Sequence, residues 1–443
     1  PALQELAEKG LRFCRFHVSS LCAPTRAMLL SGCDNHQAGL GNMPPFHATN
    51  QYLQPGYEGP LNHRVMTIAE VLRGEGYRTY MVGKWHLGAL PGFRPEDRGF
   101  ERVFSFLGGG VSHFDDHRAL ASAELPHTRY DEDGADVTDS LPKDFFSSDY
   151  YTDKLLTYLA EHPDDAPFFA YLSFMAPHDP RTMPREYLEM FPPASVELPP
   201  NLLPHHPFDN GALTVRDELL AALPRDPEEM RRHIAEYYAM ITHADAQMGR
   251  VLEALHRTGH ADNTIIVFAG DNGLALGQHG LMGKQSLYEH SIRVPLVLAG
   301  PGVPAGVERD APCFLLDIYP TLCELLGLPA PPSVEGRSLV PVMTGAERRV
   351  RETMLYAYEG AQRAAQDERF KLIETRVNGL SVTRLFDLDE DPWEMRDLSN
   401  DPGYATRVRR LREALRRWPE ELGDDQEGLG AAFWAAEACG RIP

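Results

Sequence analysis

The 443-residue sequence has few cysteines, no long apolar run and no excess of basic residues. Six cysteines in a chain of this length do not form a disulfide framework, and no Cys-x-x-Cys pair indicates a zinc site. No apolar run reaches the roughly 18 residues that a membrane-spanning helix needs. The formal net charge of −21 argues against nucleic acid and anionic membranes as partners. It does not exclude a small anionic substrate, because salt screens distant charges and a local cluster of cations sets the potential of a pocket.

The order of apolar stretches predicts an α/β protein. Strands alternate with helices through residues 60–330, which favours a mostly parallel, mixed sheet with helices on both faces. After Ser338, shorter β-like stretches alternate with acidic turns and end in a charged helix near residues 404–417. We therefore expect one large domain over residues 1–338 and a smaller antiparallel α+β subdomain over residues 339–443.

The most informative stretch is Cys22-Ala23-Pro24-Thr25-Arg26. Proline suits the first turn of a helix, so Cys22 is expected at a helix N-terminus, where free N–H groups favour a negative group. Arg26 follows one turn later on the same face and adds a fixed positive charge. The stretch predicts an anion site around a reactive side chain; the alternative is a small buried cysteine. A thiolate phosphatase is disfavoured, because its loop needs a longer spacing between cysteine and arginine.

A second candidate follows the β-rich run that ends near Val82. Lys84 and His86 are two residues apart in an extended segment, so their side chains point the same way. A cation beside an imidazole suits an anionic group that undergoes proton transfer. The alternative is a solvated lysine beside a structural histidine.

Two further predicted strands end in polar side chains. The apolar run 167–174 leads to His178, at the carboxyl end of a strand, where open α/β sheets place their sites. Another apolar strand stops at Gly270 and presents Asp271 and Asn272, whose oxygens suit calcium or magnesium. The alternative for that pair is an ordinary turn.

Three other features carry weaker signals. Lys284 lies in a glycine-flanked loop and is a second candidate anion contact, whereas His279 nearby is given no role. The run 108–110 consists of three glycines and is a weak phosphate-binding signal. The helix predicted over 227–259 assigns Tyr237 to the core, because apolar residues recur there at helical spacing.

The stretches 22–26, 83–88, 176–178 and 270–273 occur in an order that resembles the type I sulfatases of the alkaline phosphatase-like superfamily, in particular bacterial arylsulfatases. Leu385-Phe386-Asp387-Leu388 continues the resemblance into the C-terminal part. The first half is most similar to arylsulfatases, and the stretch 177–301 is more similar to sulfatases of carbohydrate or choline sulfates. The compartment stays open between the periplasm and the cytoplasm of a bacterium.

The resemblance implies a covalent mechanism at residue 22. Cys22 would be converted to formylglycine by a formylglycine-generating enzyme, and one hydroxyl of the hydrated aldehyde, deprotonated with help from Asp271, would attack sulfur. His178, assisted by Lys284, would protonate the leaving alcohol. His86 would then take a proton from the second hydroxyl and release sulfate from the formylglycine-sulfate intermediate.

The resemblance also implies ligands for sulfate and for one metal ion. Arg26, Lys84 and Lys284 would hold the sulfate oxygens. Residue 22, Asp271 and Asn272 would bind Ca²⁺, with Mg²⁺ less expected. Asparagine at 272 favours a sulfatase, because related phosphodiesterases and phosphonate hydrolases tend to carry histidine there.

One departure from the family leaves alternatives open. Sulfatases carry two more aspartates on a strand before the first helix, and this sequence has no counterpart; three ligands fall short of the six to eight oxygens that calcium takes. If the chain is complete, we expect a weakened metal site, little activity and an open sheet edge. The alternatives are a phosphoester hydrolase and an inactive protein that binds sulfated glycans. The choice of alcohol would lie in loops 34–60, 90–146 and 180–225.

Overall fold

The computed structural model describes residues 1–43, 55–114, 129–163, 165–422, 431 and 433–435. Parts of two loops expected to select the alcohol, 44–54 and 115–128, lie outside the described residues. The helices are α1 (Ala2–Lys9), α2 (Cys22–Ser31), α3 (Ile68–Gly74), α4 (Ser147–Ala160), α5 (Arg185–Leu188), α6 (Pro227–Arg257), α7 (Glu289–Ile292), α8 (Ile318–Leu325), α9 (Val340–Met343) and α10 (Ala405–Leu422). The strands are β1 (Leu11–Phe13), β2 (Phe16–His17), β3 (Arg78–Lys84), β4 (Arg102–Phe106), β5 (Tyr130–Glu132), β6 (Ala135–Asp136), β7 (Phe168–Ser173), β8 (Ile266–Ala269), β9 (Leu296–Ala299), β10 (Val307–Arg309), β11 (Cys313–Phe314), β12 (Met354–Tyr358), β13 (Gln362–Gln366), β14 (Phe370–Val377) and β15 (Leu380–Asp387).

The first sheet has five strands in the order β6-β5-β4-β3-β7. β3 lies between β4 and β7 and runs parallel to both, so its side chains are buried on both faces. Gly83 at its end has φ +109°, and a Cβ there would lie 2.1 Å from the carbonyl oxygen of Ser173. This close approach requires glycine and brings the ends of β3 and β7 together.

The second sheet has the order β10-β1-β9-β8 and is also mixed. β8 pairs only with β9, and β7 pairs only with β3, within the described residues. Phe168 of β7 and Ile266 of β8 pack in one cluster with Val251 of α6, so one long helix covers both edge strands. The α/β class with helices flanking mixed sheets is confirmed, but two mixed sheets replace the single, mostly parallel sheet that we expected.

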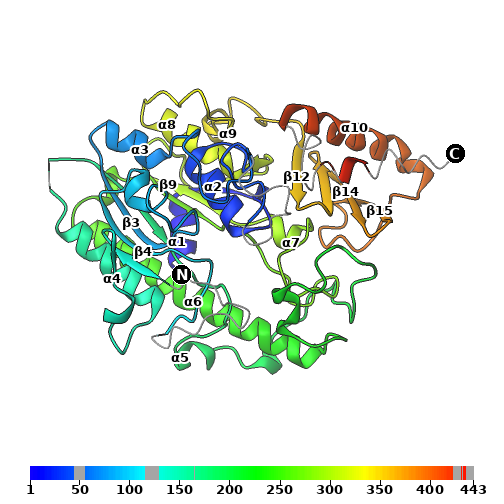
Figure 1. Ribbon diagram of the computed structural model, residues 1–443, viewed down its shortest axis with the longest axis horizontal. Helices are drawn as coiled ribbons and strands as arrows, with labels where there is room; N and C mark the ends of the chain where they lie inside the picture. The colour runs from blue at the N-terminus through cyan, green and yellow to red at the C-terminus, as the bar shows by residue number, and fades with distance from the viewer. Residues whose placement is uncertain (44–54, 115–128, 164, 423–430, 432, 436–443) are drawn as a thin grey trace.

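The C-terminal part is an antiparallel sheet in the order β12-β13-β14-β15, as the sequence predicts. α10 lies beside this sheet (Figure 1). Leu411 and Leu415 of α10 pack in one cluster with Leu372 and Leu385 of the sheet. Strand β13 was not predicted, because its sequence Gln-Arg-Ala-Ala-Gln has no apolar alternation, yet it is buried between β12 and β14.

Among the described residues, none of the helices combines the length and apolar character needed to cross a membrane.

Candidate active site

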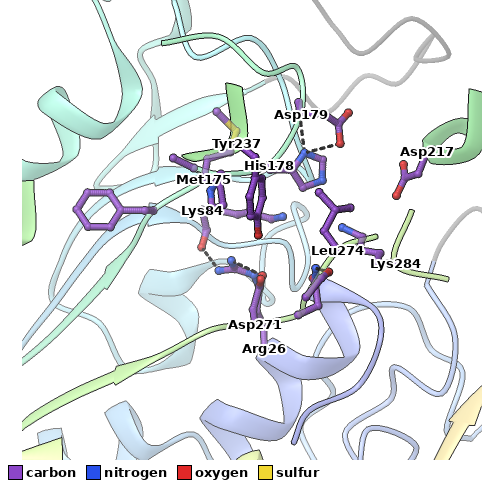
Figure 2. A pocket seen from close by; sticks show the side chains of 15 residues that line it. Arg26, Lys84, Met175, His178, Asp179, Asp217, Tyr237, Asp271, Leu274 and Lys284 are labelled. Atoms are coloured by element: carbon purple, nitrogen blue, oxygen red, sulfur yellow. Dashed lines mark hydrogen bonds and ion pairs between the residues drawn. The ribbon is translucent and has the colours of Figure 1, made fainter. Parts of the chain in front are cut away.

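A polar pocket lies where β3, β7 and β8 end, beside the N-terminal half of α2. Figure 2 shows side chains from these elements converging on it. Its lining includes five of the predicted site residues and the predicted metal ligand Asn272, namely Arg26, Lys84, His178, Asp271, Asn272 and Lys284. The structure therefore brings together residues that are up to 258 positions apart, because the carboxyl ends of neighbouring strands meet at one place.

Cys22 is the first residue of α2 and is buried. Its Sγ lies 3.4 Å from Nδ1 of His86 and 3.9 Å from Nζ of Lys284. Burial alone would raise the pKa of the Cys22 thiol, but Lys284, Lys84 and His86 outweigh it and hold that pKa well below its usual value. The structure therefore places a histidine and a lysine beside residue 22, and anion binding there stays a prediction.

Arg26 ties the three strand ends to one another. Its Nη1 donates to the carbonyl oxygen of Lys84 at 2.9 Å and also to the hydroxyl of Ser173, while Nη2 donates to Oδ2 of Asp271 at 2.8 Å. The side chain is almost wholly buried. Since protein groups accept most of its hydrogen bonds, Arg26 fixes the geometry of the site besides contributing positive charge.

Lys84 lines the pocket from the end of β3, whereas His86, like Cys22, lies outside this lining and contacts the Sγ of Cys22. Burial lowers the pKa of Lys84 to about 8, despite the opposing pull of the thiolate of Cys22. His86 has φ +61°, and a Cβ on Gly109 would lie 2.7 Å from its ring. The glycine run 108–110, a weak phosphate signal in the sequence, thus makes room for the imidazole of His86.

His178 follows β7 and is fixed through Nδ1, which donates to the carbonyl oxygen of Asp179 at 2.6 Å. The ring is thereby held with Nε2 available for proton transfer. Nε2 of His113 lies 2.9 Å from the carbonyl oxygen of His178, and this contact stabilises the backbone that follows β7. Burial, Lys284 and Lys84 lower the pKa of His178 well below its usual value, and a bound anion would raise that pKa again.

Asp271 and Asn272 follow β8 and offer oxygen atoms to the pocket. Burial would raise the pKa of Asp271, but Arg26, Lys84 and Lys284 outweigh it and hold that pKa far below its usual range. Oδ2 of Asp271 already accepts from Arg26, and Nδ2 of Asn272 donates to the carbonyl oxygen of Gly273 at 2.9 Å. This donor set is right in kind for Ca²⁺ or Mg²⁺ but incomplete, since the described residues contain no cluster of three or more His, Cys, Asp or Glu arranged around a metal.

Sequence reasoning missed part of the pocket wall. Asp179, Asp217 and Tyr237 line the pocket, and no spacing signal marked the two aspartates. Asp179 directly follows His178, whereas Asp217 comes from a distant loop and contacts Gln285.

Tyr237 was assigned to the core from helical spacing; it does pack against the core cluster around Met230 and Ile234, and it lines the pocket as well. His279 does not belong to the lining; it is buried and stacked on Tyr288, with ring centroids 4.1 Å apart.

Three cations, His178 and Asp271 line the pocket, and Cys22 lies at a helix N-terminus 3.9 Å from Nζ of Lys284. These are the groups that hydrolysis of an anionic ester needs. The chain belongs to the sulfatase family, because the family model named Sulfatase matches residues 1–328. A second model, N-sulphoglucosamine sulphohydrolase, C-terminal, matches residues 277–421. Sulfatases hydrolyse sulfate esters, and the family generally uses formylglycine and a divalent metal ion.

Individual relatives agree with this assignment. The chain is 33% identical over 397 residues to an arylsulfatase of Klebsiella aerogenes, which covers 77% of this chain and 85% of the relative. It is 28% identical over 427 residues to a choline-sulfatase of Rhizobium meliloti, which covers 91% of this chain and 78% of the relative.

Solved structures share the fold. A protein solved with its substrate D-glucosamine-2-N,6-O-disulfate has a TM-score of 0.75 at 23% identity, over 96% of this chain and 93% of that one. The phosphonate monoester hydrolase of Agrobacterium radiobacter has a TM-score of 0.69 at 22% identity, over 95% and 91%. The alkaline phosphatase-like fold expected from the sequence is thereby confirmed.

Proposed function

We propose that this protein hydrolyses aryl or carbohydrate sulfate esters through residue 22 in its formylglycine form. The observation that carries the proposal is the position of Cys22, within hydrogen-bonding reach of His86 and of Lys284, which lines the pocket together with Lys84 and Arg26. Converted by a formylglycine-generating enzyme, residue 22 supplies two hydroxyls on one carbon, one to attack sulfur and one whose deprotonation releases sulfate.

The other side chains have distinct tasks in this proposal. Lys84 and Lys284 bind the sulfate oxygens and stabilise the charge that develops on them. His86, whose Nδ1 lies 3.4 Å from the side chain of residue 22, takes the proton that releases sulfate. His178 donates a proton from Nε2 to the leaving oxygen, and Arg26 orients Asp271 beside residue 22.

We further propose Ca²⁺ as the metal, with Asp271, Asn272 and residue 22 among its ligands. When bound, the ion would supply positive charge beside the attacking oxygen. Because the described donor set is incomplete, calorimetric titration should give a dissociation constant for Ca²⁺ weaker than about 10⁻⁴ M. Micromolar binding that Asp271→Asn abolishes would contradict the expected weakness and show that further oxygens complete the shell.

The test of function compares sulfate and phosphate esters of one alcohol, 4-nitrophenol, in protein shown to carry formylglycine. We expect turnover of the sulfate, its loss in Cys22→Ala and its retention in Cys14→Ser, since the thiol of Cys14 faces Glu308 on β10 at 3.9 Å and not the cations beside Cys22. A preference for phosphate would support the phosphoester alternative, because phosphonate monoester hydrolases share this fold. Binding of sulfated glycans without any turnover would support an inactive binding protein.

A further inference from the structure

We propose that Arg216 and Asp217 are positioning residues that hold the proton donor His178 and the sulfate-binding Lys284 in register for protonation of the leaving alcohol. Both lie in the short 3₁₀ helix Arg216–Leu220, within the connection 180–225 that carries no readable motif. The inference rests on the proposed function, because it assigns the machinery of leaving-group protonation in that reaction.

On one side, the guanidinium of Arg216 holds the residue that fixes His178. Nη1 of Arg216 lies 2.9 Å from Oδ2 of Asp179, and Nη2 donates to Oδ1 of Asp179 at 3.1 Å. The carbonyl oxygen of Asp179 accepts from Nδ1 of His178 at 2.6 Å, and its Oδ1 lies 3.5 Å from the same nitrogen. One hydrogen bond and one ion contact from Arg216 therefore fix Asp179, which in turn sets the orientation of the His178 ring.

On the other side, Asp217 anchors the loop that presents Lys284. Oδ2 of Asp217 accepts from Nε2 of Gln285 at 2.8 Å, and Oε1 of Gln285 accepts from the backbone N–H of Lys284 at 2.9 Å. A Cβ on Gly283 would lie 2.9 Å from Cβ of Asp217, so the loop packs tightly against this residue. Through Gln285, Asp217 thus fixes the position of the Lys284 backbone, from which the lysine side chain extends into the pocket.

The two halves form one connected network. Nε of Arg216 donates to Oδ1 of Asp217 at 2.8 Å, which joins the His178 side to the Lys284 side. The side chains of Asp179 and Asp217 are only 9% and 5% exposed, so each depends on this network for its partners. Although Asp217 lines the pocket, both of its oxygens are already engaged, which favours a positioning role over direct binding of substrate.

The chemistry of the leaving group separates positioning from mere structural support. A nitrophenolate departs with little need for a proton, whereas a sugar or alkyl alkoxide is a poor leaving group unless it is protonated as it leaves. A displaced His178 or Lys284 should therefore impair alkyl and sugar sulfates far more than aryl sulfates. A general loss of folding or of sulfate binding would impair both classes equally.

The experiment measures kcat and KM for 4-nitrophenyl sulfate and for glucosamine 6-sulfate in the full chain. Asp217→Asn and Arg216→Lys keep the size or charge of each side chain but break the forked contacts. We expect each variant to lose at least about tenfold in kcat on the sugar sulfate and less than about threefold on the aryl sulfate, a fraction of what general acid catalysis contributes. Arg185→Gln is the matched control, since Arg185 lies in the same connection, is 89% exposed and, among the described residues, forms an ion pair only with Glu189; it should change neither rate.

The outcomes distinguish this inference from the proposed function. Selective loss on the sugar sulfate supports the inference, and the retained aryl sulfatase activity shows that the variants fold. Equal losses on both substrates, or no loss in either variant, would overturn the inference while leaving the sulfatase activity of the wild type in place. Failure of the wild type to cleave either ester would contradict the proposed function and the inference that rests on it.

Discussion

Lys84 is a cation held where little water reaches it, and this burial has a measurable consequence. Its pKa is lowered to about 8, so the ammonium loses its proton in a pH range where exposed lysines keep theirs. The thiolate of Cys22 raises the pKa of Lys84. Conversion of Cys22 to formylglycine removes this thiolate and therefore lowers the pKa of Lys84 further.

We therefore predict that kcat/KM for a sulfate ester falls above about pH 8, because this ratio reports the titration of free enzyme. In Lys84→Arg the guanidinium stays charged. The fall of kcat/KM at alkaline pH should therefore move to higher pH, even if kcat/KM at the optimum is lower. The control is Lys143→Arg, at an exposed position outside the pocket lining. A limb that stays in place in Lys84→Arg would show that another group titrates there.

Most individual site residues could be predicted because each lies in a local motif with its own chemistry. Cys22 with Arg26, and Lys84 with His86, are close in sequence, and His178 and Asp271 each follow an apolar strand. Asp217 could not be found in this way, because its partners Gln285 and Arg216 become informative only once loops distant in sequence have met.

Some site side chains are positioned by backbone that packs directly against them, and Gly109 beside the ring of His86 is an example. A Cβ at this position would lie 2.7 Å from Cε1 and 2.8 Å from Nε2 of His86. We predict that Gly109→Ala displaces the His86 ring and slows turnover at least about tenfold, since general base catalysis depends on hydrogen-bonding geometry. Gly74→Ala, at the end of α3 with no atom within 4 Å of the added Cβ, should leave the rate unchanged. Steady-state rates with circular dichroism of both variants check this; equal rates would refute the steric role of Gly109.

Helices and strands were predictable where periodicity was strong, as in α6 and β7. The sequence did not predict β13, since a polar strand is buried only because two neighbours pair with it. Nor did local patterns reveal that β7 and β8 are edges of two separate sheets in the described structure, because pairing is a long-range property.

The molecule as a whole combines a strongly negative charge with a locally positive pocket. The net charge is −21, whereas Arg26, Lys84 and Lys284 line one pocket, and Nζ of Lys284 lies 3.9 Å from Sγ of Cys22. Screening over about 8 Å leaves the local cluster in control of anion binding.

A buried ionic hub links the C-terminal sheet to the catalytic part. Nζ of Lys371 on β14 lies 2.8 Å from Oε1 of Glu289 on α7 and 2.6 Å from Oε1 of Glu394, and all three side chains are at most 10% exposed. The backbone N–H of Glu289 also donates to Oε2 of Glu394 at 2.7 Å. Removal of the lysine charge would leave two carboxylates facing each other inside the protein.

We predict that Lys371→Met lowers the free energy of unfolding by about 3–5 kcal/mol, the usual effect of breaking a buried ion pair on one side. The triple variant with Glu289→Gln and Glu394→Gln should recover part of this loss, because no uncompensated charge remains. Urea denaturation measures both, with Lys9→Met in the exposed Lys9–Glu5 pair as a control expected to change little. A triple variant no more stable than Lys371→Met would show that packing, not charge, dominates this contact.

The central claim is that residue 22 acts as formylglycine in a sulfatase, and mass spectrometry of the tryptic peptide 16–26 tests it most directly. In protein co-expressed with a formylglycine-generating enzyme, replacement of the thiol by an aldehyde predicts a mass about 18 Da below that of the cysteine peptide. The modified fraction should rise and fall with the sulfate release of each preparation. An unmodified Cys22 in a preparation that hydrolyses sulfate esters would contradict the account.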